Sequence, residues 1–253
     1  MSKINTPPMS YIEYKAIIIN ILATGKYRDY ADVMPEKPFI VLRHDIEFSP
    51  ERALKMQEIE NSLNFKSSYF FQITNNTYNA FSKKNTGLIK EIYANGHHVG
   101  LHYHLNGKTD LEDIADDIKL QSRVMSEMLG ILIDRFSFHR PTKDVLRANI
   151  EVAGLINTYN PLFFTFAEKM EAGTRLDVKY TADSMHKWSY GFPNEEMLNS
   201  FPQMQILVHP YSWTLVGYDN LENFKTLIQE KNSELVESIN SECKHFQEVR
   251  YAL

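Results

Sequence analysis

The polar residues of this chain that are best suited to chemistry follow short apolar runs at several points in the sequence. Five of the nine histidines stand there with three carboxylates and an arginine. The set comprises His44, Asp45, Glu47, His102, His104, His139, Arg140, Asp183 and His209. Any one of these histidines alone is better explained as a hydrogen-bonded structural residue. If the apolar runs are parallel strands, however, their carboxyl ends share one edge, and the whole set predicts a catalytic or metal site.

Two imidazoles and a carboxylate that leave coordination positions open are typical of hydrolytic zinc sites, where the metal lowers the pKa of a bound water to about 7. His102 and His104 would face the same side of a continuing strand. A nearby carboxylate could deprotonate the water, and a histidine across the site could protonate the leaving group. Arg140 could steady that carboxylate or bind an anionic substrate. The chemistry we expect is therefore hydrolysis.

The segment Phe39 to Glu47 is predicted to be the strand around which the site is organised. Its apolar run suits a strand that is covered on both faces, and Pro38 stands at its entry. Ser49, Pro50 and Glu51 then provide an N-cap, a proline at the first helical position and an acid in the first turn. A strand, a polar loop and a helix follow one another here.

The same alternation recurs along the chain and predicts an α/β fold. Further strands are expected at Ser67–Ile73, His98–Leu101, Phe136–Phe138, Val178–Ala182 and Gln205–Val208, with strand-like aromatics over Thr158–Phe166. Helices are expected from Ser10 to Gly25, after Ser49, over Gly87–Asn95 and Asp110–Leu129, near Asn149–Asn157, and as one or two long closing helices from Asp219. We expect one domain over 1–253, with a helical extension at 1–37, a barrel at 39–210 and closing helices at 219–253.

Composition argues against nucleic-acid binding, because 27 basic residues stand against 32 acidic ones and no basic run occurs. Cys243 is the only cysteine, which excludes an intramolecular disulfide and a cysteine-ligated zinc site and fits a reducing compartment. Met1 to Pro8 lacks a signal-peptide core, and the apolar run at Ala16–Ala23 is short for a membrane span. We therefore expect a cytoplasmic protein without an integral membrane segment; the sequence leaves the oligomeric state open.

Between Phe39 and Pro210 the motifs resemble the polysaccharide deacetylase superfamily, also called the NodB-homology or carbohydrate esterase family 4 group. Leu42 to Glu47 resembles the first motif, which implies that Asp45 is the catalytic base and Glu47 a metal ligand. Gly96 to His104 resembles the second motif, and His102 matches its first metal histidine. Asn106 stands where the family has its second histidine, so either His104 is the ligand or the site is altered.

The remaining motifs imply further roles by resemblance. His139-Arg140-Pro141 resembles the third motif, whose arginine orients the base. Asp183 to Trp188 is similar to the fourth motif, which supplies a carboxylate and a hydrophobic wall, and Leu207 to His209 resembles the last, whose histidine is the catalytic acid. Substrate contacts are expected from Asp183, Trp188, His139 and Tyr103. The aromatic residues near strand ends could stack on a sugar ring, although such residues are more often core.

The resemblance implies a distorted (β/α) barrel of about seven parallel strands. It also implies a hydrolase that depends on one divalent metal ion, with zinc expected, and that removes an acetyl or formyl group from the nitrogen of an amino sugar. The expected substrate is an intracellular nucleotide- or lipid-linked precursor of surface polysaccharide. Two alternatives stay open: a protein that keeps the pocket without turnover and binds a glycan or a partner, and an amide hydrolase acting on a non-sugar substrate.

Overall fold

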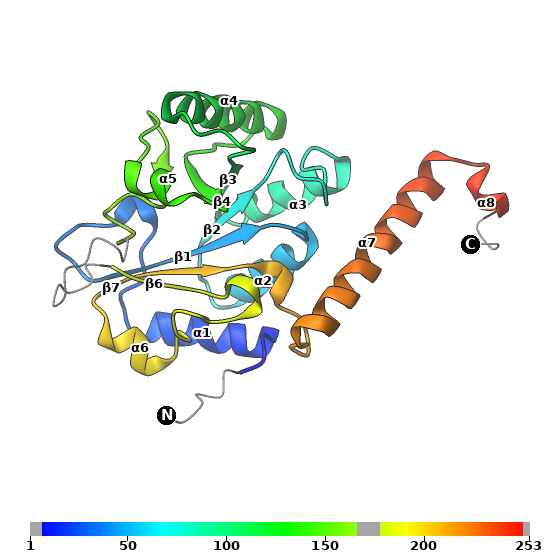
Figure 1. Ribbon diagram of the computed structural model, residues 1–253. Helices are drawn as coiled ribbons and strands as arrows, with labels where there is room; N and C mark the ends of the chain where they lie inside the picture. Colours follow the sequence, from blue (N-terminus) through cyan, green and yellow to red (C-terminus); the bar gives the residue numbers. More distant parts are fainter. Residues whose placement is uncertain (1–6, 166–177, 250–253) are drawn as a thin grey trace.

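A sheet of seven parallel strands forms the centre of the computed structural model, which describes residues 7–165 and 178–249 (Figure 1). The order across the sheet is β5-β4-β3-β2-β1-β7-β6. The strands are β1 Phe39–Ile46, β2 Ser68–Phe71, β3 His98–His104, β4 Arg135–His139, β5 Ile156–Asn157, β6 Lys179–Ala182 and β7 Gln203–Val208. The sheet curls into a half-barrel with helices around it, which confirms the expected distorted (β/α) barrel.

The strand β1 lies in the middle of this sheet, and all eight of its residues are buried. It pairs with β2 on one side and β7 on the other, so the chain runs outward from β1 to β5 and then returns on the far side of β1 to form β6 and β7. In such sheets ligands bind beyond the carboxyl ends of the strands, where the strand order reverses. The exit of β1 is such a point.

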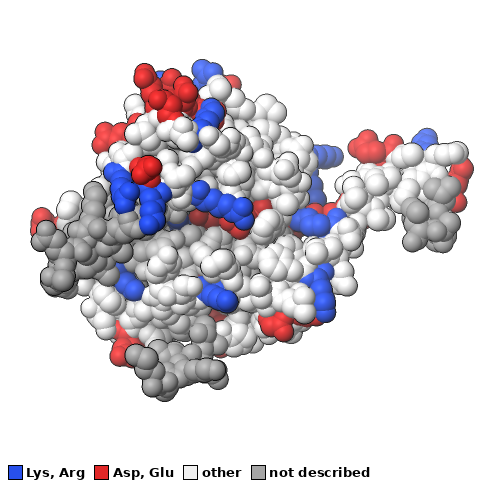
Figure 2. Space-filling model, viewed as in Figure 1, with Lys and Arg blue, Asp and Glu red and all other residues white. Residues whose placement is uncertain are grey.

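Helices cover the sheet, and most of them begin at a side-chain cap. Their bounds are α1 Tyr11–Ala23, α2 Pro50–Ser62, α3 Lys83–Ala94, α4 Leu111–Leu129, α5 Lys143–Ala148, α6 Glu195–Ser200, α7 Asn220–Glu242 and α8 Phe246–Val249. Ser10 caps α1 and Ser49 caps α2, as their spacing predicts, because each hydroxyl accepts a bond from a backbone N–H of the first turn. Acidic side chains gather over α4 (Figure 2).

The region after β4 differs from the sequence prediction. Residues 149–157 were expected to end a helix, but α5 already ends at Ala148, and Asn149 adopts a left-handed conformation with φ of 47°. Ile156 and Asn157 instead form β5. The expected strand at Thr158–Phe166 is a series of turns as far as residue 165, since Pro161 interrupts the run; Phe166 lies outside the described residues.

The long closing helix α7 is confirmed and projects from the body with α8 at its far end (Figure 1). Asn223 and Leu227 are its buried residues, while several large apolar side chains elsewhere on the helix are exposed. Among the described residues, no helix combines the length and apolar character that crossing a membrane requires.

Candidate active site

A cavity of about 620 Å³ opens at the carboxyl ends of β1, β3, β4 and β7. Each of these strands delivers at least one polar residue to it, and the segment after β6 closes one side. The sequence-predicted residues in its wall are Asp45, Glu47, His102, His139, Arg140 and His209. These six side chains therefore line one cavity at the carboxyl edge of the sheet.

Three of the residues in the wall could hold a metal ion. One donor atom each from Glu47, His102 and His139 lies within 4.8 Å of the other two. The Glu47 Oε1 atom lies 3.0 Å from His139 Nδ1. Although burial acts in the opposite direction, the hydrogen bond from His139 and the neighbouring histidines hold the pKa of Glu47 below its usual value. The carboxylate is thus ionised at neutral pH, as a metal ligand must be.

His102 is prepared for ligation in a way that only the structure reveals. Its Nδ1 atom lies 2.8 Å from Ser137 Oγ, which fixes the ring. Its buried Nε2 atom, by contrast, has no hydrogen-bond partner among the described residues. Burial holds the pKa of His102 well below 6.5, so the imidazole is neutral. An unsatisfied buried nitrogen is costly, and a bound cation would satisfy it, so the donor set fits a divalent metal such as zinc.

The third member of this set is His139 rather than the expected His104. Parallel pairing places His104 beside His139 on β4, and the two rings lie 4.9 Å apart between centroids. His139 lies between His102 and His104, so it is the histidine that approaches Glu47. Asn106 comes after the end of β3 and is exposed. The sequence motif gave no sign that a histidine from another strand could stand in this position.

Asp45 is buried at the base of the cavity and is held by three neighbours. Ser137 Oγ donates to its Oδ1 atom at 3.2 Å, and Arg43 Nη2 lies 3.5 Å from Oδ2. His102 Nδ1 lies 3.7 Å from the same Oδ2 atom. These contacts hold the Asp45 carboxylate in a fixed position at the cavity, where a general base is required.

The arginine beside Asp45 is Arg43, not the expected Arg140. Arg43 is fully buried, donates to the hydroxyls of Thr158 and Tyr159, and lies over the Tyr159 ring. Arg140 is exposed at the exit of β4, has a φ of 48°, and lines the rim of the cavity. Strand periodicity offered the missed signal, because residues 43 and 45 of β1 must face the same side.

His209 lines the same cavity and is oriented by Asp183. Its Nδ1 atom lies 2.6 Å from Asp183 Oδ1, and its Nε2 atom lies 3.9 Å from Glu47 Oε1. Burial would lower the pKa of His209, but the attraction of Asp183 outweighs it and raises the pKa to about 9. The imidazolium form therefore predominates at neutral pH, which suits a proton donor.

Asp183, Trp188 and Tyr103, which were expected to contact substrate, have other contacts. Asp183 is fully buried and accepts from His209 and from Trp213 Nε1 at 2.7 Å. Trp188 packs in the core near Trp213. Tyr103 points to the opposite face of β3 from His102, and its hydroxyl donates to Asp117 at 2.8 Å. None of these three side chains lines the cavity.

The cavity also has an aromatic wall that the sequence indicated only in part. Phe138 and Tyr211 are aromatic residues near strand ends that were considered for sugar stacking, and both lie in the wall. The remaining aromatic members are Phe48, Tyr159, Tyr180 and Phe224. Phe224 comes from α7, far along the chain, and no local pattern links it to the strand exits. Aromatic side chains beside a polar centre are suited to the apolar faces of a sugar ring or to another flat apolar group.

Comparisons with known proteins find fold-level similarity alone. No family model matches this sequence, and no curated protein does. Among solved structures, the chain is similar to a family 4 carbohydrate esterase from Bacillus anthracis, with 13% identity and a TM-score of 0.44 over 85% of this chain and 84% of that chain. It is also similar to a chitin deacetylase from Colletotrichum lindemuthianum, with 14% identity and a TM-score of 0.41 over 78% of this chain and 84% of that chain.

A third similar structure is a CE4 family pseudoenzyme from Bacillus anthracis, with 14% identity and a TM-score of 0.41 over 79% of this chain and 63% of that chain. This chain thus spans less than two thirds of the pseudoenzyme's length. Two of the three proteins are described as members of carbohydrate esterase family 4, the group that the sequence motifs resemble.

Proposed function

We propose that this protein is a metal-dependent hydrolase that removes an N-acyl group from an amino sugar. The observation that carries the proposal is that the buried Asp45 carboxylate and His209, which Asp183 holds, line the same cavity as the donor group of Glu47, His102 and His139. A base and a charged acid beside residues that could hold a metal suit the cleavage of an amide by water. A binding protein needs no such pair.

In this proposal Glu47, His102 and His139 hold one divalent ion, with zinc expected. When bound, the ion supplies Lewis-acid polarisation of the acyl carbonyl and favours deprotonation of water. Asp45 takes a proton from the attacking water, and Arg43 and Ser137 hold its carboxylate in place. The water oxygen adds to the acyl carbon, the bond from carbon to nitrogen breaks, and His209 gives its proton to the departing amine. The products are a carboxylic acid and the free amino sugar.

The finer identity of the substrate is also part of the proposal. The aromatic wall supports a sugar ring next to the reacting amide. We propose an acetyl or formyl group on a nucleotide- or lipid-linked precursor of surface polysaccharide. The alternative of a pocket without turnover drew support from Asn106, but His139 supplies a second imidazole without it. The enzyme is therefore the better conclusion.

The test combines metal analysis with a substrate screen. Purified protein should take up about one equivalent of zinc per chain and hydrolyse N-acetyl or N-formyl amino sugars only when the metal is present. His102→Ala should abolish both properties, whereas His245→Ala, which alters an exposed histidine near the C-terminus, should leave them unchanged. Zinc uptake without hydrolysis of any amide would favour a binding protein, and hydrolysis of non-sugar amides alone would favour the other alternative.

A further inference from the structure

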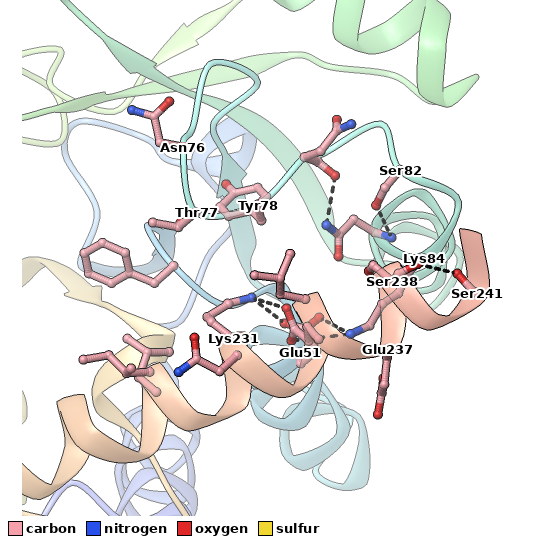
Figure 3. Close-up of a pocket in the computed structure, with 18 of the residues that line it drawn as sticks. Glu51, Asn76, Thr77, Tyr78, Ser82, Lys84, Lys231, Glu237, Ser238 and Ser241 are labelled. Atoms are coloured by element: carbon pink, nitrogen blue, oxygen red, sulfur yellow. Dashed lines mark hydrogen bonds and ion pairs between the residues drawn. The ribbon is translucent and has the colours of Figure 1, made fainter. Parts of the chain in front are cut away.

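A second cavity, of about 960 Å³, lies beside the candidate active site, between α7 and the loop that joins β2 to α3 (Figure 3). We call it the α7 groove. Phe48 and Phe224 line both the groove and the candidate active site, so the two spaces are neighbours that share an aromatic wall. The loop on the other side of the groove is also linked to the candidate active site, because the side chains of Thr77 and Asn75 donate hydrogen bonds to the backbone carbonyl oxygen of Glu47.

Large exposed apolar side chains line the helix side of the groove, together with polar residues such as Lys231 and Asn232. Phe224, Ile228 and Leu235 line it, and their side chains recur at helical spacing along one face of α7. Phe224 is 36% exposed, Ile228 58% and Leu235 59%. The stretch between the first and last of them is about 16 Å long at the helical rise per residue. Lys231 and Asn232 interrupt this row between Ile228 and Leu235. Large apolar side chains exposed along a groove are nevertheless typical of a surface that is covered by a ligand or partner.

The loop side of the groove has polar residues, but most of their polar atoms already have partners. Tyr78 donates its hydroxyl to the Ile46 carbonyl, and Thr77 donates to Glu47. Asn79 Oδ1 accepts from Phe81 N, Ser82 Oγ accepts from Asn85 N, and Asn85 Nδ2 donates to the Asn79 carbonyl. These bonds build the loop and the cap of α3. Asn85 Oδ1, however, is buried without a hydrogen-bond partner among the described residues, so it is the apolar side chains of α7, and not the loop, that favour a hydrocarbon chain over a further sugar.

The charged residues of the groove neutralise one another. Lys84 Nζ lies 2.7 Å from Glu51 and 3.4 Å from Glu234, while Lys231 Nζ lies 2.8 Å from Glu234 and 3.4 Å from Glu51 (Figure 3). Two cations and two anions thus form a closed ring. A phosphate group that approached either lysine would also meet both carboxylates, so the ring is poorly suited to the diphosphate of a nucleotide.

We infer that the α7 groove binds a hydrocarbon chain attached to the sugar whose amide occupies the candidate active site. This inference rests on the proposed function and sharpens it, because it favours a lipid-linked sugar over a nucleotide-linked one. The chain would pass over the shared wall of Phe48 and Phe224 and cover Ile228 and Leu235, while the sugar stays beside Asp45. Each methylene that leaves water on binding strengthens affinity by about fourfold.

The inference can be tested with alkyl glycosides of N-acetylglucosamine that differ only in chain length. Binding of the methyl and dodecyl glycosides to the full chain is measured by calorimetry, below the concentration at which micelles form. We expect the dodecyl compound to bind at least about tenfold more tightly, since a few buried methylenes suffice for that factor. Equal affinities for the two compounds would overturn the inference.

Substitutions on α7 test whether the preference for the long alkyl chain arises in the α7 groove. Ile228→Gln and Leu235→Gln together should remove most of the preference for the dodecyl chain and leave methyl glycoside binding unchanged. Val236→Gln is the matched control, because Val236 is 49% exposed on the same helix but does not line the groove. A comparable loss in the control would overturn the inference, as would tighter binding of an N-acetylglucosamine tetrasaccharide than of the dodecyl glycoside.

The groove and the proposed reaction can fail separately. Preference for the long chain is a binding measurement and needs no turnover, whereas hydrolysis of the methyl glycoside by the zinc-loaded protein needs no groove. Preference without hydrolysis would reject the proposed function alone, and hydrolysis without preference would reject the groove alone. Sedimentation at several protein concentrations completes the test: a dimer that the double substitution disrupts would show that a second copy occupies the groove, which would overturn the inference.

Discussion

His44 and Asp45 are neighbours on β1, yet they belong to polar clusters on opposite faces of the strand. His44 lies 2.7 Å from the Tyr14 hydroxyl and stacks on Tyr69, and both tyrosines donate to Glu60 on α2. Ser67 also donates to Glu60. We call this group the core cluster. The site cluster is formed by Asp45, Glu47, His102, His139 and His209 on the other face.

Both clusters contain histidines and carboxylates, but they differ in whether their polar atoms have hydrogen-bond partners. In the core cluster, three hydroxyl groups donate to the Glu60 carboxylate. Burial lowers the pKa of His44 to about 3, so this imidazole is neutral. The site cluster opens to a cavity and keeps the free Nε2 atom of His102. Histidines and carboxylates together do not identify a site; an open cavity and an unpaired donor atom do.

The largest effect is expected from Asp45→Asn, which removes the proposed base and leaves the fold intact. If the site cluster is catalytic, hydrolysis by the zinc-loaded protein should fall by about 100- to 10,000-fold, measured as kcat/KM on a substrate identified in the screen. Asp116→Asn on the exposed face of α4 is the control and should have wild-type activity. An active Asp45→Asn enzyme would remove Asp45 as the base.

Single alanine substitutions test whether His139 or His104 is the metal ligand. His139→Ala should weaken zinc affinity by at least about 100-fold, because it removes a ligand of the geometric set. His104→Ala should change it little, since this ring approaches His139 rather than Glu47. Competition with a chelator of known affinity measures both. The reverse order of effects would restore His104 as the ligand that the sequence suggested.

The core cluster should be visible as a dependence of stability on pH. Burial raises the pKa of Glu60 to about 7 although three hydroxyls donate to it. On its own, Glu60 therefore binds more protons in the folded state than in the unfolded state between about pH 4.5 and 7, so its contribution to stability falls as the pH rises through this range. The buried His44, whose pKa is lowered, contributes in the opposite direction. A shift of this size corresponds to about 3 kcal/mol.

Urea unfolding at pH 5 and pH 7.5 measures this contribution. Glu60→Gln should remove the Glu60 contribution, so its stability at pH 5 relative to pH 7.5 should be lower than that of the wild type, whereas Glu58→Gln on the exposed side of the same helix should keep the wild-type pH dependence. Equal pH dependence in wild type and Glu60→Gln would show that the core cluster carries no such linkage. Zinc affinity should be unaffected in both variants, since Glu60 lies on the opposite face of β1 from the site.

The smallest effect is expected at Arg140. Arg140→Gln should lower kcat by less than about tenfold, because the exposed guanidinium at the rim does not hold the base. Arg43→Lys should lower kcat more than this, since a lysine keeps the charge but loses the planar group that reaches Asp45, Thr158 and Tyr159. Steady-state kinetics compare the two, and a larger effect at Arg140 would restore it as the orienting arginine.

Local patterns predicted the framework of this protein well. The apolar run of β1, the serine caps of α1 and α2, and the long closing helix all follow from short-range rules that tertiary contacts did not override. The region after β4 was predicted poorly. There Asn149 and Pro161 interrupt the pattern, and pairing with Arg135 and Phe136 decides that Ile156 and Asn157 form a strand.

The sequence by itself determined which residues reach the carboxyl edge of the sheet, because strand exits are local features and parallel strands align them. It therefore placed Asp45, Glu47, His102 and His209 around one cavity. Only the tertiary structure decided which neighbour each of them meets. Strand register brings His139 rather than His104 to Glu47, the two-residue period of β1 brings Arg43 to Asp45, and the fold of the chain after β6 buries Asp183 against His209. Distances of a few ångströms across strands depend on register and packing, which no single segment encodes.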